Sequence, residues 1–145
     1  MTDQVQLACA ISSTNPTAAV GLEIWIDNTQ IYNTEHVADT VNFAHELADT
    51  DGEHQLRFVM KNKNETHTIV DKEGNIMSDC CICISNISFD EIPLGQTFVN
   101  QAIYEHNFNG TADTVQDKFY GEMGCNGTVT LEFTTPVYLW LLENM

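Results

Sequence analysis

The residues best suited by type and spacing to hold an ion lie in the acidic segment Asp49 to Glu53, with sequence Asp-Thr-Asp-Gly-Glu. Carboxylates at alternate positions are the oxygen ligands that calcium loops use. However, the segment lacks the third aspartate and the distal glutamate of an EF-hand loop, and Asp and Gly are also preferred in hairpin turns. We therefore predict a structural turn without a cofactor, with calcium binding as the alternative.

The five cysteines and five histidines form no recognisable catalytic or metal-binding motif. Cys80, Cys81 and Cys83 share one predicted strand, on which adjacent side chains point to opposite faces, whereas zinc sites need cysteines that converge from a turn. Cys125 lies in a turn without a motif for a nucleophile and its base. We predict that these cysteines are reduced thiols and that the protein is not an enzyme.

Trp25 is the aromatic residue with the clearest capacity for binding. The segment Gly21 to Asp27 alternates apolar and polar residues, which predicts a strand with Trp25 pointing outward between Glu23 and Asp27. An outward tryptophan beside carboxylates suits a sugar-stacking platform or an anchor in a protein interface. A third interpretation, burial of Trp25 under a neighbouring flap, stays open.

The charge of the chain excludes some partners. It has 21 acidic and 5 basic residues among 145, for a net charge of −16. Nucleic acid and anionic membrane surfaces need clustered Lys and Arg, so we expect neither as a partner. The first four residues carry no basic region, and no apolar run approaches about 18 residues, so we expect no signal peptide and no membrane span.

The pattern of short alternating segments predicts an all-β protein: one antiparallel β-sandwich, jelly-roll-like, over residues 1–145. Residues 40–47 and 53–61 are expected to form a hairpin through the acidic turn, and residues 62–78 a projecting flap hairpin. A bulge is expected near Ser85, and one short helical turn fits within residues 94–104. The expected strands are 4–11, 21–27, 31–32, 40–47, 53–61, 80–89, 103–108 and 128–133.

The last strand is expected at Val137 to Leu142, which is apolar on both faces. If alternate residues beginning with Val137 face the core, then Tyr138, Trp140 and Leu142 face outward. A row with a tyrosine and a tryptophan is typical of interface anchors. Either a loop of the same chain covers these residues or another molecule does. We predict an interface on this strand, with other proteins or between copies of the chain.

Part of the chain resembles a family of binding proteins. The sequence Leu-Glu-Ile-Trp-Ile-Asp at 22–27 with its turn, the predicted hairpin over 41–61 and the strand 80–91 ending in Ser-Asn-Ile-Ser-Phe-Asp-Glu carry the resemblance. Together they resemble small calcium-dependent carbohydrate-binding modules of the xylan-binding type, over about Val5 to Ile92. This resemblance implies glycan binding with calcium, and Trp25 is the candidate contact residue.

The tail, from Lys118-Phe-Tyr-Gly121 through Trp140 to Met145, is similar to the C-termini of small virion-associated proteins of marine tailed bacteriophages. This resemblance implies a structural protein of a virion, a capsid decoration or a tail or fibre component, assembled in the host bacterial cytoplasm. We therefore expect a non-enzymatic virion protein that docks on other virion proteins through its C-terminal strand. A calcium-dependent module for host or environmental glycans is the alternative.

Overall fold

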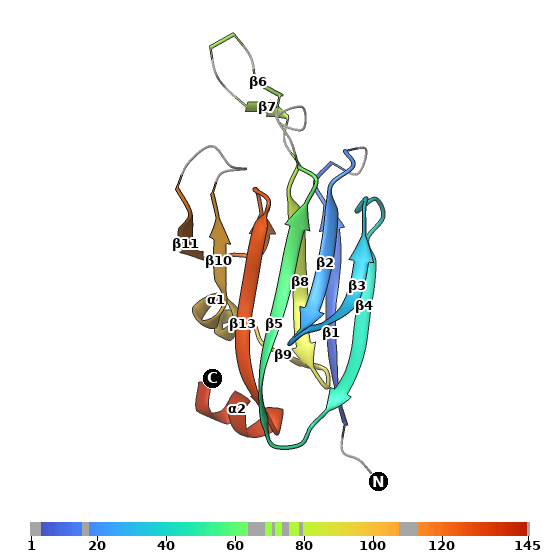
Figure 1. Cartoon of the computed structure of the whole chain (residues 1–145), viewed down its shortest axis with the longest axis vertical. Coiled ribbons are helices and arrows are strands. Elements are labelled where there is room, and N and C mark those ends of the chain that lie inside the picture. Colours follow the sequence, from blue (N-terminus) through green and yellow to red (C-terminus); the bar gives the residue numbers. More distant parts are fainter. Residues whose placement is uncertain are drawn as a thin grey trace.

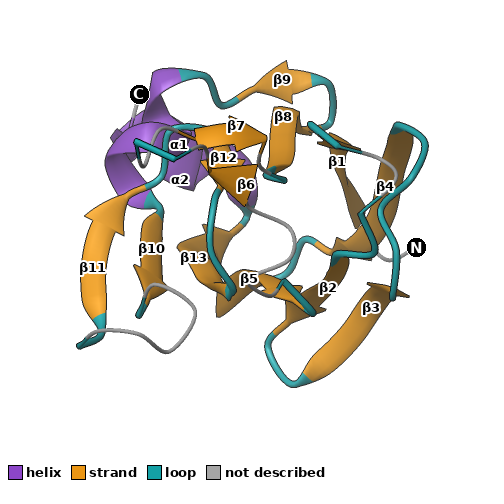
Figure 2. Cartoon of the chain, turned by 90° about the horizontal axis from the view of Figure 1, so that it is seen from above, coloured by secondary structure: helices purple, strands orange, loops and turns teal. Residues whose placement is uncertain are grey.

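The structure is a computed structural model that describes residues 4–15, 18–63, 69–70, 72–73, 76–78, 80–107 and 113–144. It confirms the antiparallel β-sandwich: two sheets lie face to face (Figures 1 and 2). Sheet A has the order β12 (Glu122–Met123), β8 (Ile82–Phe89), β1 (Gln4–Ser13), β4 (Val41–Ala48), with β9 (Ile92–Pro93) also paired to β8. Sheet B has the order β11 (Val115–Lys118), β10 (Ile103–His106), β13 (Gly127–Thr135), β5 (Gly52–Lys61), β2 (Gly21–Ile26), β3 (Thr29–Thr34).

The long pair of β5 and β13 forms the centre of sheet B. The two strands pair along their whole length, from Gly52 opposite Thr135 to Met60 opposite Gly127. Their apolar residues alternate with polar ones, so Phe58 and Leu131, with their apolar neighbours on both strands, are buried against sheet A. The polar residues of both strands consequently share the opposite face.

A bulge in β8 explains how one strand keeps all its large residues in the core. The register with β1 shifts between Ala8, which lies opposite Ser88, and Ala10, which lies opposite Ser85. The extra residue moves Ile87 and Phe89 onto the core face, because an inserted residue reverses the alternation. The predicted bulge near Ser85 is confirmed. Without the bulge, strict alternation from Ile82 would place Ile87 and Phe89 on the strand face that points away from the core.

The predicted hairpin of residues 40–47 and 53–61 is wrong. β4 pairs with β1 in sheet A, whereas β5 pairs with β2 and β13 in sheet B. The turn between them carries the chain from one sheet to the other, at the lower end of Figure 1. Alternation in a sequence tells which side of a strand faces the core, but it does not tell which strand lies beside it.

The largest correction concerns the tail. Val137–Asn144 forms the helix α2 and not a strand. Its buried residues, Val137, Trp140 and Leu141, follow the i, i+3, i+4 spacing of one helix face. Trp140 is therefore not outward: it is 6% exposed, and its ring contacts those of Phe89 and Phe133 at centroid distances of 6.4 Å.

The remaining elements are small. The expected helical turn in 94–104 is the helix α1 (Gln96–Gln101), whose Phe98 packs in the core. In the flap region, β6 (Ile69–Val70) pairs with β7 (Ile76–Ser78) as a separate ribbon at the upper end of Figure 1, while residues 64–68, 71, 74 and 75 lie outside the described residues. The single-domain boundary stays a prediction. No helix in the described part of the chain is long and apolar enough to cross a bilayer.

Candidate functional site

Several kinds of binding side chain meet on the polar face of sheet B. We call it the outer face of sheet B. Figure 2 shows both helices on the same side of sheet B as sheet A, and no described element lies over the outer face. Its residues on the three central strands are Glu23, Trp25, Gln55, Arg57, Val59, Lys61, Thr128, Thr130 and Glu132.

One row of this face runs across four strands. Trp25 lies opposite Arg57, Arg57 opposite Thr130, and Thr130 opposite Ile103. The guanidinium carbon of Arg57 is 5.6 Å from the centroid of the Trp25 ring, which is a cation–π contact. The row thus places an aromatic ring, a cation, a hydroxyl group and an apolar side chain next to one another.

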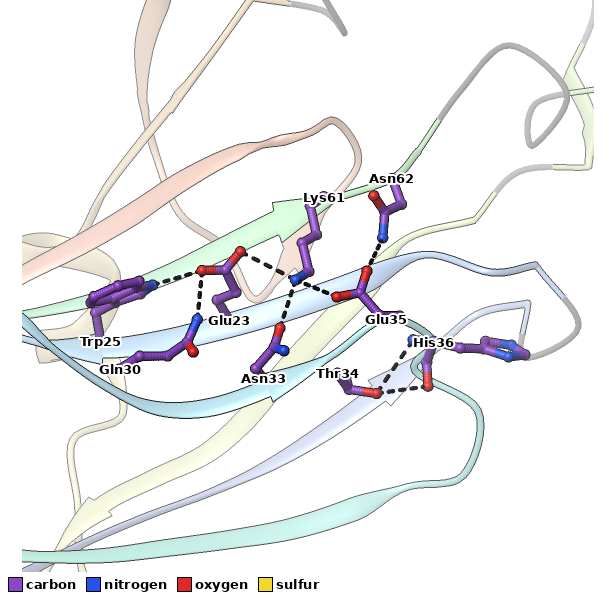
Figure 3. A network of polar contacts seen from close by, with 9 residues as sticks. All are labelled: Glu23, Trp25, Gln30, Asn33, Thr34, Glu35, His36, Lys61 and Asn62. Carbon is purple, nitrogen blue, oxygen red and sulfur yellow. Dashed lines mark hydrogen bonds and ion pairs between the residues drawn. The ribbon is translucent and has the colours of Figure 1, made fainter.

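Glu23 fixes the orientation of the indole ring. Trp25 Nε1–H donates a hydrogen bond to Glu23 Oε1 (3.0 Å), and the side-chain amide of Gln30 donates to the same oxygen (2.8 Å), as Figure 3 shows. The ammonium of Lys61 lies 3.2 Å from Glu23 Oε2. The hydrogen bond from Trp25 lowers the pKa of Glu23. Desolvation opposes this effect, but the contacts with Lys61 and Gln30 add to the lowering, so the carboxylate stays ionised in mild acid.

Lys61 connects this carboxylate to the neighbouring strand and loop. Its ammonium donates to Asn33 Oδ1 (2.6 Å) and to Glu35 Oε1 (2.9 Å), and Asn62 donates to Glu35 Oε2 (2.8 Å) (Figure 3). The hydrogen bond to Glu35, followed by the contacts with Glu23, raises the pKa of Lys61. The network holds β2, β3 and β5 together beside Trp25, so the platform around the indole is built before any ligand arrives.

The guanidinium group of Arg57 is held in place by the turn after β2. Its Nη2 donates to the backbone oxygen of Asp27 (2.9 Å), whereas its Nε is buried and has no hydrogen-bond partner in the described part of the chain. Asp27 has a positive φ of 53° and is stabilised there by its own side chain, which accepts from the Gln55 amide (2.9 Å) and from His54 (2.9 Å). The turn after β2 therefore positions both Trp25 and Arg57.

A pocket of about 360 Å³ continues the outer face toward α2. It combines carboxylates and an amide with the edges of two aromatic rings, a mixture that suits a polar ligand with apolar faces. Burial alone would raise the pKa of Asp27, but the hydrogen bonds from His54 and the Gln55 amide outweigh it and lower that pKa. The pocket is lined by Asp27, Glu53, His54, Gln55, Glu132, Phe133, Thr134 and Trp140.

Asp27, His54 and Thr135 lie in the order of a catalytic relay, which no motif in the sequence indicates. His54 Nδ1 is 2.9 Å from Asp27 Oδ2, and His54 Nε2 is 3.0 Å from Thr135 Oγ1. However, Thr135 is only 5% exposed, and its hydroxyl donates to the carbonyl of Thr50. A nucleophile must present its oxygen to a substrate. The arrangement therefore joins the turns after β2 and β4 to β13 and presents no exposed nucleophile.

One carboxylate of the acidic turn has a structural partner. Asp49 Oδ1 accepts the backbone N–H of Val137 (2.8 Å), which satisfies a free donor in the first turn of α2. Among the residues that the structure describes, no three His, Cys, Asp or Glu side chains converge to hold a metal ion. We therefore assign Asp49 to the anchoring of α2 and derive no role for an ion.

The structure separates the three residues predicted as an interface. Tyr138 is 47% exposed and Leu142 is 79% exposed, but Trp140 is buried, and Leu139 takes its place on the surface at 58%. The reason is the helix, which brings residues 138, 139 and 142 to one side and turns residue 140 inward. That Tyr138 and Leu142 contact another molecule stays a prediction.

The five cysteines are distributed over the molecule as thiols. Cys9 and Cys80 are buried, while Cys81, Cys83 and Cys125 are half-buried. Burial raises the pKa of Cys9 to about 12 and also raises that of Cys83, so neither is an activated thiolate.

Comparisons with known proteins give a likeness in fold. No family model matches the chain, and no curated protein matches it. Among solved structures, a protein described as "vCBM60 in complex with galactobiose" is similar, with a TM-score of 0.52 and 11% sequence identity over 87% of this chain and 96% of that one. At this identity the likeness shows the fold alone: the chain shares the β-sandwich architecture of that structure.

Proposed function

We propose that the chain is a non-catalytic carbohydrate-binding module whose binding surface is the outer face of sheet B. The observation that carries this proposal is the indole of Trp25, half-buried on an uncovered sheet face and oriented by Glu23. The electron-rich face of an indole attracts the partly positive C–H groups of a sugar ring. The carboxylates, amides and hydroxyls around it supply acceptors and donors for sugar hydroxyls.

The fold supports the same function. The similar structure is that of a module in complex with galactobiose, and it matches this chain over most of its length. The strand that carries Trp25 lies within the segment whose sequence resembles carbohydrate-binding modules. Galactobiose and other neutral disaccharides are therefore the first ligands to test.

The charge of the outer face favours a neutral sugar. Glu23, Glu132 and the exposed Glu105 contribute carboxylates, and the net charge of the whole chain is −16. Lys61 is already engaged by Glu23 and Glu35. A sugar acid at Trp25 would therefore meet repulsion, whereas sugar hydroxyls can donate to the carboxylates.

The test is isothermal titration of the full chain with galactobiose and with a panel of neutral oligosaccharides, with and without a chelator. We expect Trp25→Ala to abolish binding, because it removes the stacking surface. The control is Tyr120→Ala, at an aromatic residue outside the outer face that is 76% exposed, and it should leave binding unchanged. The chelator tests the calcium-dependent alternative, because a loss of binding in its presence would show that an ion takes part. An empty panel, or a Trp25→Ala variant that binds like the wild type, would refute the proposal.

A second candidate function is attachment to a larger assembly, and the exposed apolar side of α2 favours it. Tyr138, Leu139 and Leu142 expose apolar surface to water. Exposed apolar patches on a protein are typical of sites that contact another molecule. We propose, from the resemblance of the tail, that the assembly is a phage virion. Purified particles should then contain the chain, and Leu142→Asp should leave it folded but absent from particles. Particles that lack the wild-type chain would exclude this candidate.

A further inference from the structure

The exposed side of α2 forms a surface that we call the α2 surface, made by Ile92, Tyr138, Leu139 and Leu142. It lies at the end of the sandwich opposite the β6–β7 ribbon (Figure 1). A cavity of about 420 Å³ opens on it, lined by Ile92, Tyr138, Leu141 and Leu142, with almost no polar lining. A cavity of this kind accepts an apolar side chain and offers little to a sugar.

The cavity has a fixed wall. The hydroxyl of Tyr138 donates to Asp90 Oδ2 (2.9 Å), which holds the phenol ring across the turn between β8 and β9. Leu141, beside it in the helix, is 5% exposed and belongs to the core. The cavity is therefore bounded on both sides by anchored side chains, and Leu142, at 79% exposed, projects from its rim.

Several acidic residues lie beside the α2 surface. Asp90 and Glu91 lie in the turn that holds Tyr138, and Glu143 follows Leu142 on the helix. The hydrogen bond to Asp90, together with the charge of Asp49, raises the pKa of Tyr138. Lys61, in contrast, lies at the far end of β5, where it pairs with Glu23 and Glu35. An apolar centre with an acidic rim is thus complementary to an apolar side chain that has basic neighbours.

We infer that the α2 surface binds a protein partner through an apolar side chain flanked by lysine or arginine residues. This inference rests on the proposed attachment and names the chemistry of its partner. A second copy of the chain does not fit, because it would bring two acidic rims together at a net charge of −16 per copy. An anionic lipid surface is disfavoured for the same reason.

The test uses the full chain, labelled for NMR, and two synthetic peptides with the same Leu-Trp-Leu centre, one flanked by lysines and one by glutamates. We expect the lysine peptide to shift the amide signals of α2 and of Ile92, with an affinity that falls as salt is added. The glutamate peptide should bind at least about tenfold more weakly. Leu142→Ser should remove the shifts, whereas Ile103→Ser, a matched change at another exposed apolar residue (48%), should leave them.

The outcomes separate this inference from the proposed attachment. Equal binding of the two peptides, or binding of neither, overturns the inference, even if the chain is present in particles. Sedimentation that shows a dimer in the wild type and a monomer in Leu142→Ser also overturns it, because the partner is then a second copy. Absence of the chain from particles overturns the attachment alone, because the peptide result depends only on the α2 surface.

Discussion

The outer face of sheet B and the α2 surface are both open to solvent, but they are built in opposite ways. On the outer face, Trp25 is held by directional contacts: a hydrogen bond to Glu23 and a guanidinium from Arg57. On the α2 surface, Leu139 and Leu142 project without polar contacts of their own around an apolar cavity. The first arrangement suits a hydroxylated ligand, and the second suits hydrophobic docking.

The two surfaces therefore depend on different parts of the molecule. The outer face depends on a network of charged and polar side chains across β2, β3 and β5. The α2 surface depends on the burial of one side of a short helix against Phe89 and Phe133. A change in one support should therefore leave the other surface in place, and variants at each support test that independence.

The largest effect is expected for Trp140→Ala. This variant removes a buried aromatic ring that contacts Phe89 and Phe133, so the free energy of unfolding should fall by about 3–5 kcal/mol. Urea unfolding measures it, with Tyr138→Ala as the matched control on the exposed side of α2. If the loss is below about 1 kcal/mol, α2 is not anchored by this ring. Wherever the variant is still folded, sugar binding at Trp25 should persist.

A smaller effect is expected from acid, and it acts on the outer face. The pKa values of Asp27 and Glu23 are lowered in the folded protein. A lowered carboxyl pKa contributes stability above the unfolded value of about 4, and this contribution is lost as the pH falls through the folded pKa. The urea midpoint should therefore decline between about pH 5 and pH 2. Asp27→Asn should be less stable at pH 7 and should decline less; an unchanged decline would show that other carboxyls cause it.

The smallest effect on stability is expected for Glu23→Gln. Glu23 forms a partly exposed ion pair with Lys61, so the free energy of unfolding should change by less than about 1 kcal/mol. Its main effect should be a more mobile Trp25 ring, seen as a lower fluorescence anisotropy and several-fold weaker sugar binding. Glu35→Gln is the control, because it leaves the hydrogen bond between Trp25 and Glu23 in place. Equal effects of the two variants would show that Glu23 does not orient the ring.

The face that each strand presents to the core is largely predictable, because alternation is a local property. The outward position of Trp25 and the inward positions of Leu22 and Ile24 follow from it and agree with the structure. Glu23 and Trp25, two residues apart, are expected on one face for the same reason. Two residues of the candidate site, Glu23 and Trp25, can therefore be predicted from the local sequence.

The neighbours across strands are not predictable from the same pattern. Arg57 meets Trp25 only because β5 lies beside β2, whereas the sequence suggested a hairpin of β5 with β4. The chain order contains no local signal for the crossing between sheets at the acidic turn. The cation–π contact and the position of the pocket thus depend on long-range pairing.

The tail shows a different limit. A short apolar run fits both a buried strand and a short helix, and its length and spacing must decide between them. The i, i+3, i+4 spacing of Val137, Trp140 and Leu141 is the signal that favours the helix. Pro136, just before it, also has no N–H to continue the ladder of β13. The tail does expose an apolar surface, as expected, but this surface is formed by Tyr138, Leu139 and Leu142.

The most direct test of the sugar-binding face uses the two tryptophans of the chain as separate reporters. Each indole N–H gives its own NMR signal, and the two are assigned with Trp25→Phe and Trp140→Phe. During titration with galactobiose or another neutral oligosaccharide, the signal of Trp25 should move in a saturable way and further than that of Trp140, which lines only the adjoining pocket. Movement of the Trp140 signal without that of Trp25, or a Trp25 signal unchanged across all neutral oligosaccharides, would contradict the assignment of the outer face of sheet B as the binding surface.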